Sequence, residues 1–499
     1  MGAAQQRLNL TDSPARATRR LVTRHRVFLA VVVVGVTLRA LAWFAYQPAL
    51  MFGDSFRYLG NIGIYNPGGL HPIGYELFIL TPTLAVGGLE LVTALQHCAG
   101  VGSAIALYAL TLRHGANRWL AALAATPLLL DGYQIQIEQL IMSDAWQQVL
   151  LVALLWVLLG VGAPNPRRAA FGGLLLGMAV MLRLVAFPLV VPAVCYLVIA
   201  GGAWRSWREW AGWRTIGART LAFAVAFGVV IAGYGAYFHA ETGEWGLTRT
   251  TGNVLYGRAA VVADCDSLTL EPLPALACPE EPLGQRKRLD AYAHIQTDPT
   301  WRARFPAGTD LFAVQRSFGW AVIRQQPLDV ARAVALDFLK GFRPVRADAP
   351  GDVTVARWQF KSEYPTVDLD YSIQASREFS GRDPTAVPAL AAFLRGYQLS
   401  VGYTPGTLLG VLGIVALLAG FGLGRARHSG IRSAILLAVG MAVTILLASA
   451  AFEFSWRYQL PGLVLLPFAG VLGITALRGR GSAPTPRRRD PQPADVPGL

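Results

Sequence analysis

Asp54 is the first acidic residue after a long apolar segment, and it lies in the sequence Met51-Phe-Gly-Asp-Ser-Phe-Arg-Tyr58. If this stretch is helical, Asp54, Arg57 and Tyr58 share a face, because residues three and four apart are neighbours on a helix. A carboxylate held in place can act as a general base towards a hydroxyl, and a guanidinium can bind a phosphate through two parallel hydrogen bonds. Asp54 is equally well placed to cap a helix that starts here. The stretch therefore predicts a catalytic acid–arginine pair, a helix start, or both.

Other titratable and aromatic residues lie near the ends of further apolar segments. They are the candidate substrate-binding residues His71, Arg183, Arg457 and Tyr458, and the candidate second acids Glu138, Asp144 and Glu453. An ionisable group at membrane depth is costly unless it is paired or hydrated, so each of these residues is a candidate for function.

Each candidate also has a structural explanation. A lone histidine such as His71 is more often a structural residue than a ligand. Asp144 and the serine before it could cap the following helix. Arg183 could extend along its aliphatic chain to the membrane surface. Glu453 and Arg457 are four residues apart, a spacing that favours a local ion pair on a helix.

The composition predicts a membrane protein. Of the 499 residues, 54% are hydrophobic and 15% are charged, and the mean hydropathy is +0.41, whereas soluble domains carry about 25% charged residues. The net charge of +14 would suggest nucleic-acid binding in a soluble chain. Here the basic residues gather at the ends of apolar segments and in both terminal regions, which is typical of cytoplasmic loops. Lysine occurs only at Lys287, Lys340 and Lys361 among the 44 basic residues, which favours a GC-rich bacterial genome.

The distribution of Lys and Arg predicts ten crossings, with the N-terminus in the cytoplasm. Ten crossings require one segment, Ala170–Ala200, to be a hairpin that turns near Arg183 and Pro188. The apolar segments lie near Phe28–Tyr46, Val92–Leu112, Leu120–Leu130, Trp146–Val161, Ala170–Ala200, Leu221–Tyr237, Thr407–Leu423, Ala434–Ala451 and Pro461–Leu477.

We therefore expect an all-α polytopic membrane protein of about ten transmembrane helices. An α-rich or mixed extracytoplasmic segment lies between the seventh and eighth helices. The predicted parts are a disordered cytoplasmic N-terminus (1–26), a membrane module (27–239) with a catalytic first external loop (47–91), the extracytoplasmic segment (240–403), the C-terminal membrane helices (404–478) and a disordered cytoplasmic tail (479–499). Cys265 and Cys278 are the only cysteines of the external segment, and in an oxidising compartment they predict a disulfide.

In five places the chain resembles the polytopic glycosyltransferases of the GT-C superfamily, the class that includes protein O-mannosyltransferases and lipid A aminoarabinose transferases. The resemblance covers about Phe28 to Ala200, and a weaker similarity is found at Phe452–Leu466. It departs from many relatives at Ser55, where they carry a second acid, and at Ile73, where they carry a second proline. The external segment matches no domain that we know. The residues that carry the resemblance are Asp54-x-x-Arg57-Tyr58, His71-Pro-x-x-Tyr75, Gly132-Tyr-Gln with Ser143-Asp144, Gly173-x-x-x-Gly177 with Arg183, and Arg457-Tyr458-x-x-Pro461.

The resemblance implies that Asp54 is the catalytic base of an inverting glycosyltransferase. Such an enzyme moves a hexosyl or pentosyl unit from a polyprenyl-phosphate donor to a glycan, lipid or protein acceptor outside the bacterial cytoplasmic membrane. Arg57, Arg183 and Arg457 are then candidate phosphate partners, and Tyr58 and His71 orient the site. No cofactor is required, although a divalent metal could bind carboxylates at Asp54, Glu138 or Asp144.

Two other functions are consistent with the same residues. A lipid or polysaccharide transporter would bind phosphate with the same arginines, but the sequence has no internal repeat and its charged groups gather at one interface. A polysaccharide polymerase that uses lipid-diphosphate donors would share the external acidic and basic centre.

Overall fold

The computed structural model describes residues 14–69, 71–160, 162–201, 210–349 and 351–479. Most of this chain is helical, and five helical stretches are long and apolar enough to cross a membrane: Thr23–Ala45, Leu89–Arg113, Gly212–Thr242, Arg432–Phe452 and Trp456–Leu477. They belong to α1 (Pro14–Ala45), α4 (Leu89–Arg113), α10 (Trp210–Thr242), α20 (Arg432–Phe452), and α21 (Leu460–Leu477) with the 3₁₀ turn η8 (Trp456–Gln459). The prediction of an α-helical multi-pass membrane protein is therefore confirmed.

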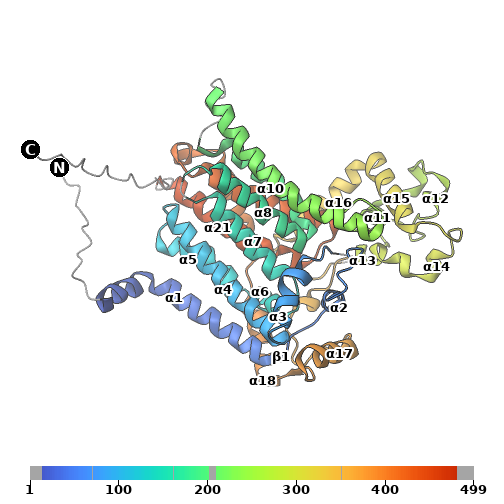
Figure 1. Cartoon of the computed structure of the whole chain (residues 1–499), viewed down its shortest axis with the longest axis horizontal. Coiled ribbons are helices and arrows are strands. Elements are labelled where there is room, and N and C mark those ends of the chain that lie inside the picture. Colours follow the sequence, from blue (N-terminus) through green and yellow to red (C-terminus); the bar gives the residue numbers. More distant parts are fainter. Residues whose placement is uncertain (1–13, 70, 161, 202–209, 350, 480–499) are drawn as a thin grey trace, which may run out of the picture.

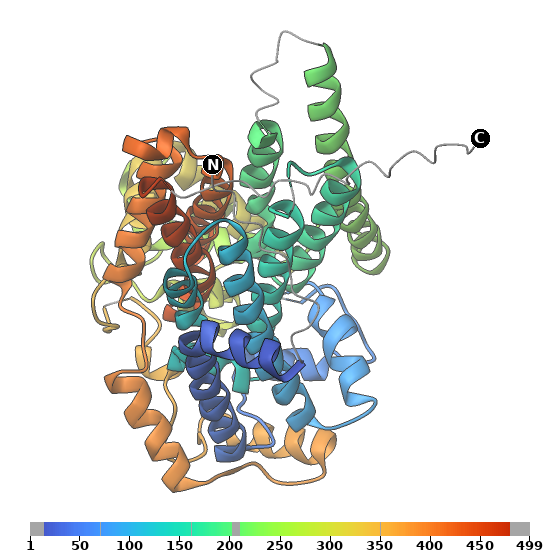
Figure 2. The same cartoon turned by 90° about the vertical axis from the view of Figure 1, so that its left-hand side faces the viewer.

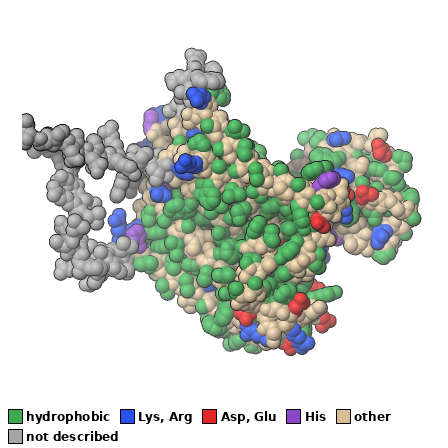
Figure 3. Space-filling model, in the orientation of Figure 1, with side chains coloured by type: hydrophobic (Ala, Val, Ile, Leu, Met, Phe, Trp, Pro, Cys, Tyr) green, Lys and Arg blue, Asp and Glu red, His purple; other side chains and the backbone are tan. Residues whose placement is uncertain are grey.

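Shorter apolar helices complete the bundle. Outward-facing apolar side chains such as Val33, Leu221 and Val229 are 64–67% exposed, as lipid contact requires. Figure 3 shows a broad apolar band between basic side chains near the termini and mixed acidic and basic side chains at the far end. The shorter helices are α5 (Arg118–Leu130), α7 (Asp144–Leu158), α8 (Pro166–Leu182), α9 (Val190–Ile199) and α19 (Gly406–Gly420).

Helix α21 is the centre of the bundle. Nearly all its side chains are buried, and it packs against α19, α20 and α5. Figures 1 and 2 show it enclosed by the other helices, with α1 and α10 at the periphery. The side chains needed for chemistry therefore reach the interior from the ends of helices that are themselves fixed by close packing.

The segment Ala170–Ala200 is broken at Arg183, as the sequence predicted. Helix α8 ends at Leu182, Arg183 is extended (φ −154°, ψ 122°), and the 3₁₀ turn η2 (Leu184–Leu189) leads into α9. Arg168 near the start of α8 and Tyr196 near the end of α9 both donate to the carbonyl of Leu158, at 3.1 and 3.0 Å. The two arms therefore return to the same end of the bundle, which confirms the hairpin.

Four short helices lie between the membrane helices at the end where Asp54 is found. They are α2 (Gly53–Gly60), the π-helix η1 (Glu76–Leu80), α3 (Thr81–Leu84) and α6 (Gly132–Gln139). The sequence predicted a structureless chain up to residue 26, but α1 already begins at Pro14. The other residues of the two predicted disordered ends, 1–13 and 480–499, lie outside the described residues.

The long segment 240–403 is α-rich. Its elements are α11 (Thr251–Val262), η4 (Cys265–Ser267), α12 (Pro272–Ala275), α13 (Leu289–Ala293), η5 (Ile295–Thr297), α14 (Pro299–Arg302), α15 (Leu311–Gln325), α16 (Pro327–Lys340), η6 (Val355–Trp358), α17 (Leu369–Ser380) and α18 (Pro388–Ser400). Figure 1 shows α11–α15 at the end of the molecule away from both termini. Between the α19 and α20 helices lies η7 (Gly424–His428). The two strands of the described chain, β1 (Tyr46–Gln47) and β2 (Thr385–Ala386), pair antiparallel.

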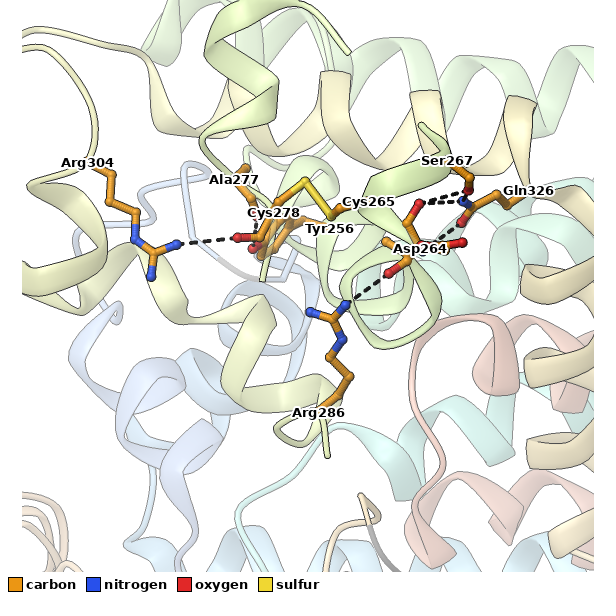
Figure 4. Close-up of a disulfide and its surroundings, with 10 residues drawn as sticks. Tyr256, Asp264, Cys265, Ser267, Ala277, Cys278, Arg286, Arg304 and Gln326 are labelled. Carbon is orange, nitrogen blue, oxygen red and sulfur yellow. Dashed lines mark hydrogen bonds between the residues drawn. A yellow bond between two sulfur atoms is a disulfide. The ribbon is translucent and has the colours of Figure 1, made fainter. Parts of the chain in front are cut away.

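The predicted disulfide is present. It joins Cys265 to Cys278 across a Cα–Cα distance of 6.2 Å, and closing a loop of this length is worth about 3 kcal/mol. Figure 4 shows Tyr256 donating to the Ala277 carbonyl and Arg304 donating to the Cys278 carbonyl, at 2.6 and 3.4 Å. The disulfide therefore closes a loop whose far end is also fixed to the small core around Tyr256.

Candidate functional site

Arg457 is the centre of a buried cluster of charges, and its side chain is 3% exposed. Its Nε and Nη2 donate to the two carboxylate oxygens of Asp144, at 3.0 and 2.8 Å. Its Nη1 donates to Asp54 Oδ2 at 2.8 Å. One guanidinium therefore bridges two carboxylates that follow different membrane helices, and the planar fork of arginine suits this role.

Arg183 completes the cluster from the break between α8 and η2. Because its backbone is extended there, the side chain leaves the apolar segment, and Nη1 donates to Asp144 Oδ2 at 2.7 Å. Its guanidinium carbon lies 5.5 Å from the ring centre of Tyr458, and that of Arg457 lies 5.7 Å from the same ring. Tyr458 is thus close to both arginines, and its ring attracts both cations.

Asp54 lies in the first turn of α2. The helix N-cap is Phe52, and its backbone N–H donates to the hydroxyl of Ser55 at 3.0 Å. Asp54 is not the N-cap residue, so its alternative role as a helix cap is wrong. Arg57, which is half-exposed, donates to Asp54 Oδ1 at 3.4 Å, as the spacing predicted. Burial opposes ionisation of Asp54, but His71 and the positive charge of Arg457 outweigh it and hold the pKa of the carboxyl well below its usual range.

His71 and Tyr58 support this carboxylate. His71 Nε2 lies 3.7 Å from Asp54 Oδ1, and burial lowers the pKa of the imidazole although Asp54 opposes the shift. Tyr58 stacks on the His71 ring at 5.5 Å and shares a hydrogen bond of 3.0 Å with the hydroxyl of Ser143. Gly74 lets this loop pack on α8, because a Cβ there would meet the backbone of Met181. Tyr58 is buried outside the cavity, so it positions His71.

A cavity of about 550 Å³ adjoins the cluster. Part of its apolar lining comes from η2 and from the end of α20, which are membrane segments, and its polar lining includes residues of α11, α13 and the stretch 453–458. Its lining includes Asp54, Arg57, His71, Arg183, Leu184, Val185, Pro188, Asn253, Asp290, Arg357, Trp358, Phe452, Glu453, Ser455, Arg457 and Tyr458. The cavity thus combines apolar lining residues with charged ones.

Two of the expected acids have other roles than the sequence suggested. Glu138 does not reach the cluster and is held by Arg39 at 2.7 Å. Glu453 lines the cavity but does not pair with Arg457, because the chain leaves the helix at Glu453 and becomes extended (φ −156°, ψ 146°). The predicted local ion pair is therefore wrong. Asp144 begins α7, but Ser143 before it makes no capping hydrogen bond, and the Asp144 carboxylate binds the two arginines.

The sequence reasoning missed most residues that line the cavity, among them four polar or aromatic ones near the charged groups. Asn253, Arg357 and Trp358 come from the segment 240–403, and Ser455 lies between Glu453 and Arg457. Trp358 packs 5.3 Å below the Arg457 guanidinium. Nothing in their residue types or spacing marks them, and only the fold of the long segment brings them to the site.

Within the described residues, no three His, Cys, Asp or Glu side chains are grouped to hold a metal ion. A hard cation could bind carboxylate oxygens of both Asp54 and Asp144. The guanidinium of Arg457 lies between these two carboxylates and binds both. A divalent cation bound between these two carboxylates would have to displace Arg457.

Comparisons with known proteins found similar solved structures. No protein-family model and no curated protein sequence matches the chain. The oligosaccharyltransferase AglB from Archaeoglobus fulgidus, in complex with an inhibitory peptide and a dolichol-phosphate, is 13% identical, with a TM-score of 0.40 over 90% of this chain and 50% of that chain. An Archaeoglobus fulgidus oligosaccharyltransferase in complex with Zn and sulfate is 11% identical, with a TM-score of 0.39 over 93% of this chain and 54% of that chain.

A bacterial structure is similar at the same low level. ArnT from Cupriavidus metallidurans, bound to undecaprenyl phosphate, is 14% identical, with a TM-score of 0.29 over 92% of this chain and 79% of that chain. AglB and ArnT are both members of the GT-C superfamily, the class that the sequence resembles. This chain spans about half the length of AglB. Similarity of this degree does not carry an activity from one protein to another.

Proposed function

We propose that this protein is an inverting glycosyltransferase. It transfers a hexosyl or pentosyl unit from a polyprenyl-phosphate donor to a glycan, lipid or protein acceptor at the external face of a bacterial cytoplasmic membrane. The observation that carries the proposal is a cluster of two carboxylates and two arginines beside a cavity that also has apolar lining residues. A lipid phosphate has the matching parts, an apolar chain and an anionic head.

The arginines of the cluster retain hydrogen-bonding capacity. A guanidinium has five N–H groups. Among the described residues, Arg183 makes one hydrogen bond and Arg457 makes three. Arg57 is half-exposed and holds Asp54 only loosely, at 3.4 Å. Free N–H groups beside a cavity are suited to bind phosphate oxygens through charge-assisted hydrogen bonds. The apolar side chains of Leu184 and Val185 would contact the first isoprene units of the donor.

Asp54 is the base in this mechanism. Its low pKa keeps it ionised but makes it a weak base in the free enzyme. A donor phosphate that draws Arg457 and Arg57 towards itself takes positive charge away from Asp54 and raises its basicity. The carboxylate then accepts the proton of the acceptor hydroxyl while the hydroxyl oxygen bonds to the anomeric carbon. The bond from that carbon to the phosphate oxygen breaks, its electron pair leaves with the phosphate, and the anomeric configuration inverts.

The orientation in the membrane is part of the proposal. Ten crossings and an external segment 240–403 follow from the positions of Lys and Arg in short loops. The Cys265–Cys278 disulfide supports an external location for this segment, because disulfides persist in oxidising compartments. The cluster lies at the same end of the molecule as this segment, since Asn253 and Trp358 line the same cavity. We place the catalytic first loop, 47–91, on that side.

The test is a transfer assay with Asp54→Asn in proteoliposomes that contain polyprenyl-phosphate mannose or arabinose. We expect transfer to fall by about 10²- to 10⁴-fold, the usual contribution of a general base, while the melting temperature stays near that of the wild type. Asp383→Asn, which removes an exposed carboxylate paired with Arg377, is the matched control and should retain full activity.

Full transfer by Asp54→Asn at normal expression would refute the role of Asp54 as base. If that variant does not fold, Asp54→Glu keeps the charge and moves the carboxyl by one methylene, and it should still lose most of the transfer. Translocation of the lipid from one leaflet to the other without sugar transfer would identify a transporter instead. Release of a lipid diphosphate would identify a polymerase.

A further inference from the structure

Besides His71 Nε2 and Trp358 Nε1, three buried polar side chains of the cavity each have an atom without a hydrogen-bond partner among the described residues. They are Asn253, Glu453 and Ser455, which are 3%, 5% and 2% exposed. The atoms without a partner are the Oδ1 of Asn253, the Oε1 of Glu453 and the Oγ of Ser455. A buried polar atom without a partner costs about 1–3 kcal/mol. Three of them lining one cavity therefore indicate a ligand that supplies hydrogen bonds there.

The backbone directs two of these side chains to the site of the arginines. Glu453 and Ser455 are both extended, with φ values of −156° and −144°, so their side chains point the same way. Two residues later the chain reaches Arg457. The part of a ligand that binds beside Glu453 and Ser455 therefore lies next to the part that binds Arg457.

The stretch that carries Glu453 is fixed from the external segment. Arg258 on α11 donates to the carbonyl of Ala450 at 2.7 Å and to Asp337 on α16. Asn253 lies on the same helix α11, less than two turns before Arg258. Helix α11 therefore sets the position of Asn253 and also holds the end of α20 from which Glu453 extends. The three unpartnered side chains are held at fixed positions, as a specific binding site requires.

We propose that Asn253, Glu453 and Ser455 form the subsite that binds the hydroxyl groups of the transferred sugar. This inference rests on the function proposed above. An amide oxygen accepts a hydrogen bond, whereas a serine hydroxyl and a protonated carboxyl both donate and accept. Sugar hydroxyls also donate and accept, so the three side chains match a sugar ring. The phosphate at Arg457 and Arg183 places the sugar beside them.

Burial keeps Glu453 neutral, which gives it a proton to donate. Burial, followed by the charge of Asp290 on α13, raises the pKa of Glu453 to about 8, and Arg357 on η6 and Arg258 on α11 oppose the shift. Tyr458 on η8 is the other titratable group beside it. Below about pH 8 the carboxyl is protonated and can both donate and accept. Above that pH it can only accept.

The experiment compares two lipids bound to the purified protein in nanodiscs. Polyprenyl phosphate tests the phosphate subsite alone, and polyprenyl-phosphate mannose tests phosphate and sugar together. We expect Glu453→Ala and Asn253→Ala each to lower the preference for the sugar-bearing lipid by about tenfold, the value of one hydrogen bond. Affinity for polyprenyl phosphate should stay within about twofold, because the arginines are unchanged.

The matched control is Glu76→Gln. Glu76 is also a buried carboxyl (3% exposed), and burial raises its pKa to about 7, but it does not line the cavity. Its replacement should leave the preference for the sugar unchanged. Glu453→Gln should keep most of the preference, since an amide also donates and accepts. Between pH 7 and pH 9 the preference of the wild type should fall, whereas that of Glu453→Gln should not.

The acceptor could offer the same hydroxyls, so a second arm measures the binding of mannobiose to protein loaded with polyprenyl phosphate. Losses confined to this arm would assign the three side chains to an acceptor sugar. Equal losses for both lipids, or no loss in either arm, would overturn the subsite. If Glu453→Ala does not fold, Asn253→Ala and the pH comparison decide the question. A wild type that binds neither lipid would overturn the proposed function itself.

Discussion

Two buried clusters of acids and arginines differ in how completely their hydrogen bonds are used. The cavity cluster consists of Asp54, Asp144, Arg183 and Arg457, and the helix cluster consists of Arg39, His97, Gln134 and Glu138 from α1, α4 and α6. In the helix cluster, all five N–H groups of Arg39 have partners: Glu138 and three backbone carbonyls. Each of the two carboxylate oxygens of Glu138 accepts two hydrogen bonds, and the side chain is fully buried.

The cavity cluster is incomplete by comparison. Within the described chain, Arg183 uses one of its five N–H groups and Arg457 uses three. His71 Nε2 has no hydrogen-bond partner there. Charge at membrane depth is thus a sign of function only where donors remain unused beside a cavity. A cluster with every hydrogen bond made is a structural tie between helices.

The largest effect should come from Arg39→Met in the helix cluster. Removal of Arg39 leaves Glu138 buried without its compensating charge, which costs about 3–5 kcal/mol. We expect the folded fraction to collapse in a thermal or denaturant titration, with transfer lost in proportion to folded protein. Arg377→Met, at an exposed ion pair with Asp383, should change stability by less than about 0.5 kcal/mol. A stable Arg39→Met protein with a selective loss of transfer would reverse the assignment of the two clusters.

A smaller effect on stability and a selective effect on activity should follow from Arg457→Lys. An ammonium keeps the charge but cannot bind Asp54 and both oxygens of Asp144 as the planar fork does. We expect transfer to fall by about 10²-fold, or about 2.7 kcal/mol, with less destabilisation than Arg39→Met causes. The measurement pairs a transfer assay with a melting curve. Loss of folding as severe as that of Arg39→Met would mean that this cluster, too, is only structural.

Part of this contrast could be read from the sequence. The positions of Lys and Arg in short loops predicted that Asp54, Arg57 and Arg183 lie at one end of the molecule, because the charge distribution along the chain indicates membrane topology. The partner of Glu138 could not be predicted. Arg39 lies within an apolar helix 99 residues away, and Gly100 allows the carboxylate to approach α4, since a Cβ there would collide with it.

The residues on the polar side of the cavity could also not be predicted from the sequence. The spacing of Glu453 and Arg457 favoured a helical ion pair, but the backbone becomes extended at Glu453 and sends the arginine to Asp54 and Asp144. Local spacing cannot foresee such a helix end, because distant carboxylates determine where the arginine goes. Asn253 is an ordinary residue type in a segment that carries none of the motifs of the family resemblance, and packing of α11 against α20 brings it to the site.

The smallest effect concerns pH. In the free enzyme, the low pKa of Asp54 and the lowered pKa of His71 leave a carboxylate and a mostly neutral imidazole between pH 6.5 and pH 7.5. The value of kcat/KM, which reports free-enzyme groups, should therefore be flat within about twofold over that range. Once donor phosphate draws Arg457 away, the pKa of Asp54 rises, so the acid limb of kcat should lie at higher pH than that of kcat/KM. Coincident acid limbs would mean that Arg457 stays on Asp54 during the reaction, as Arg39 stays on Glu138.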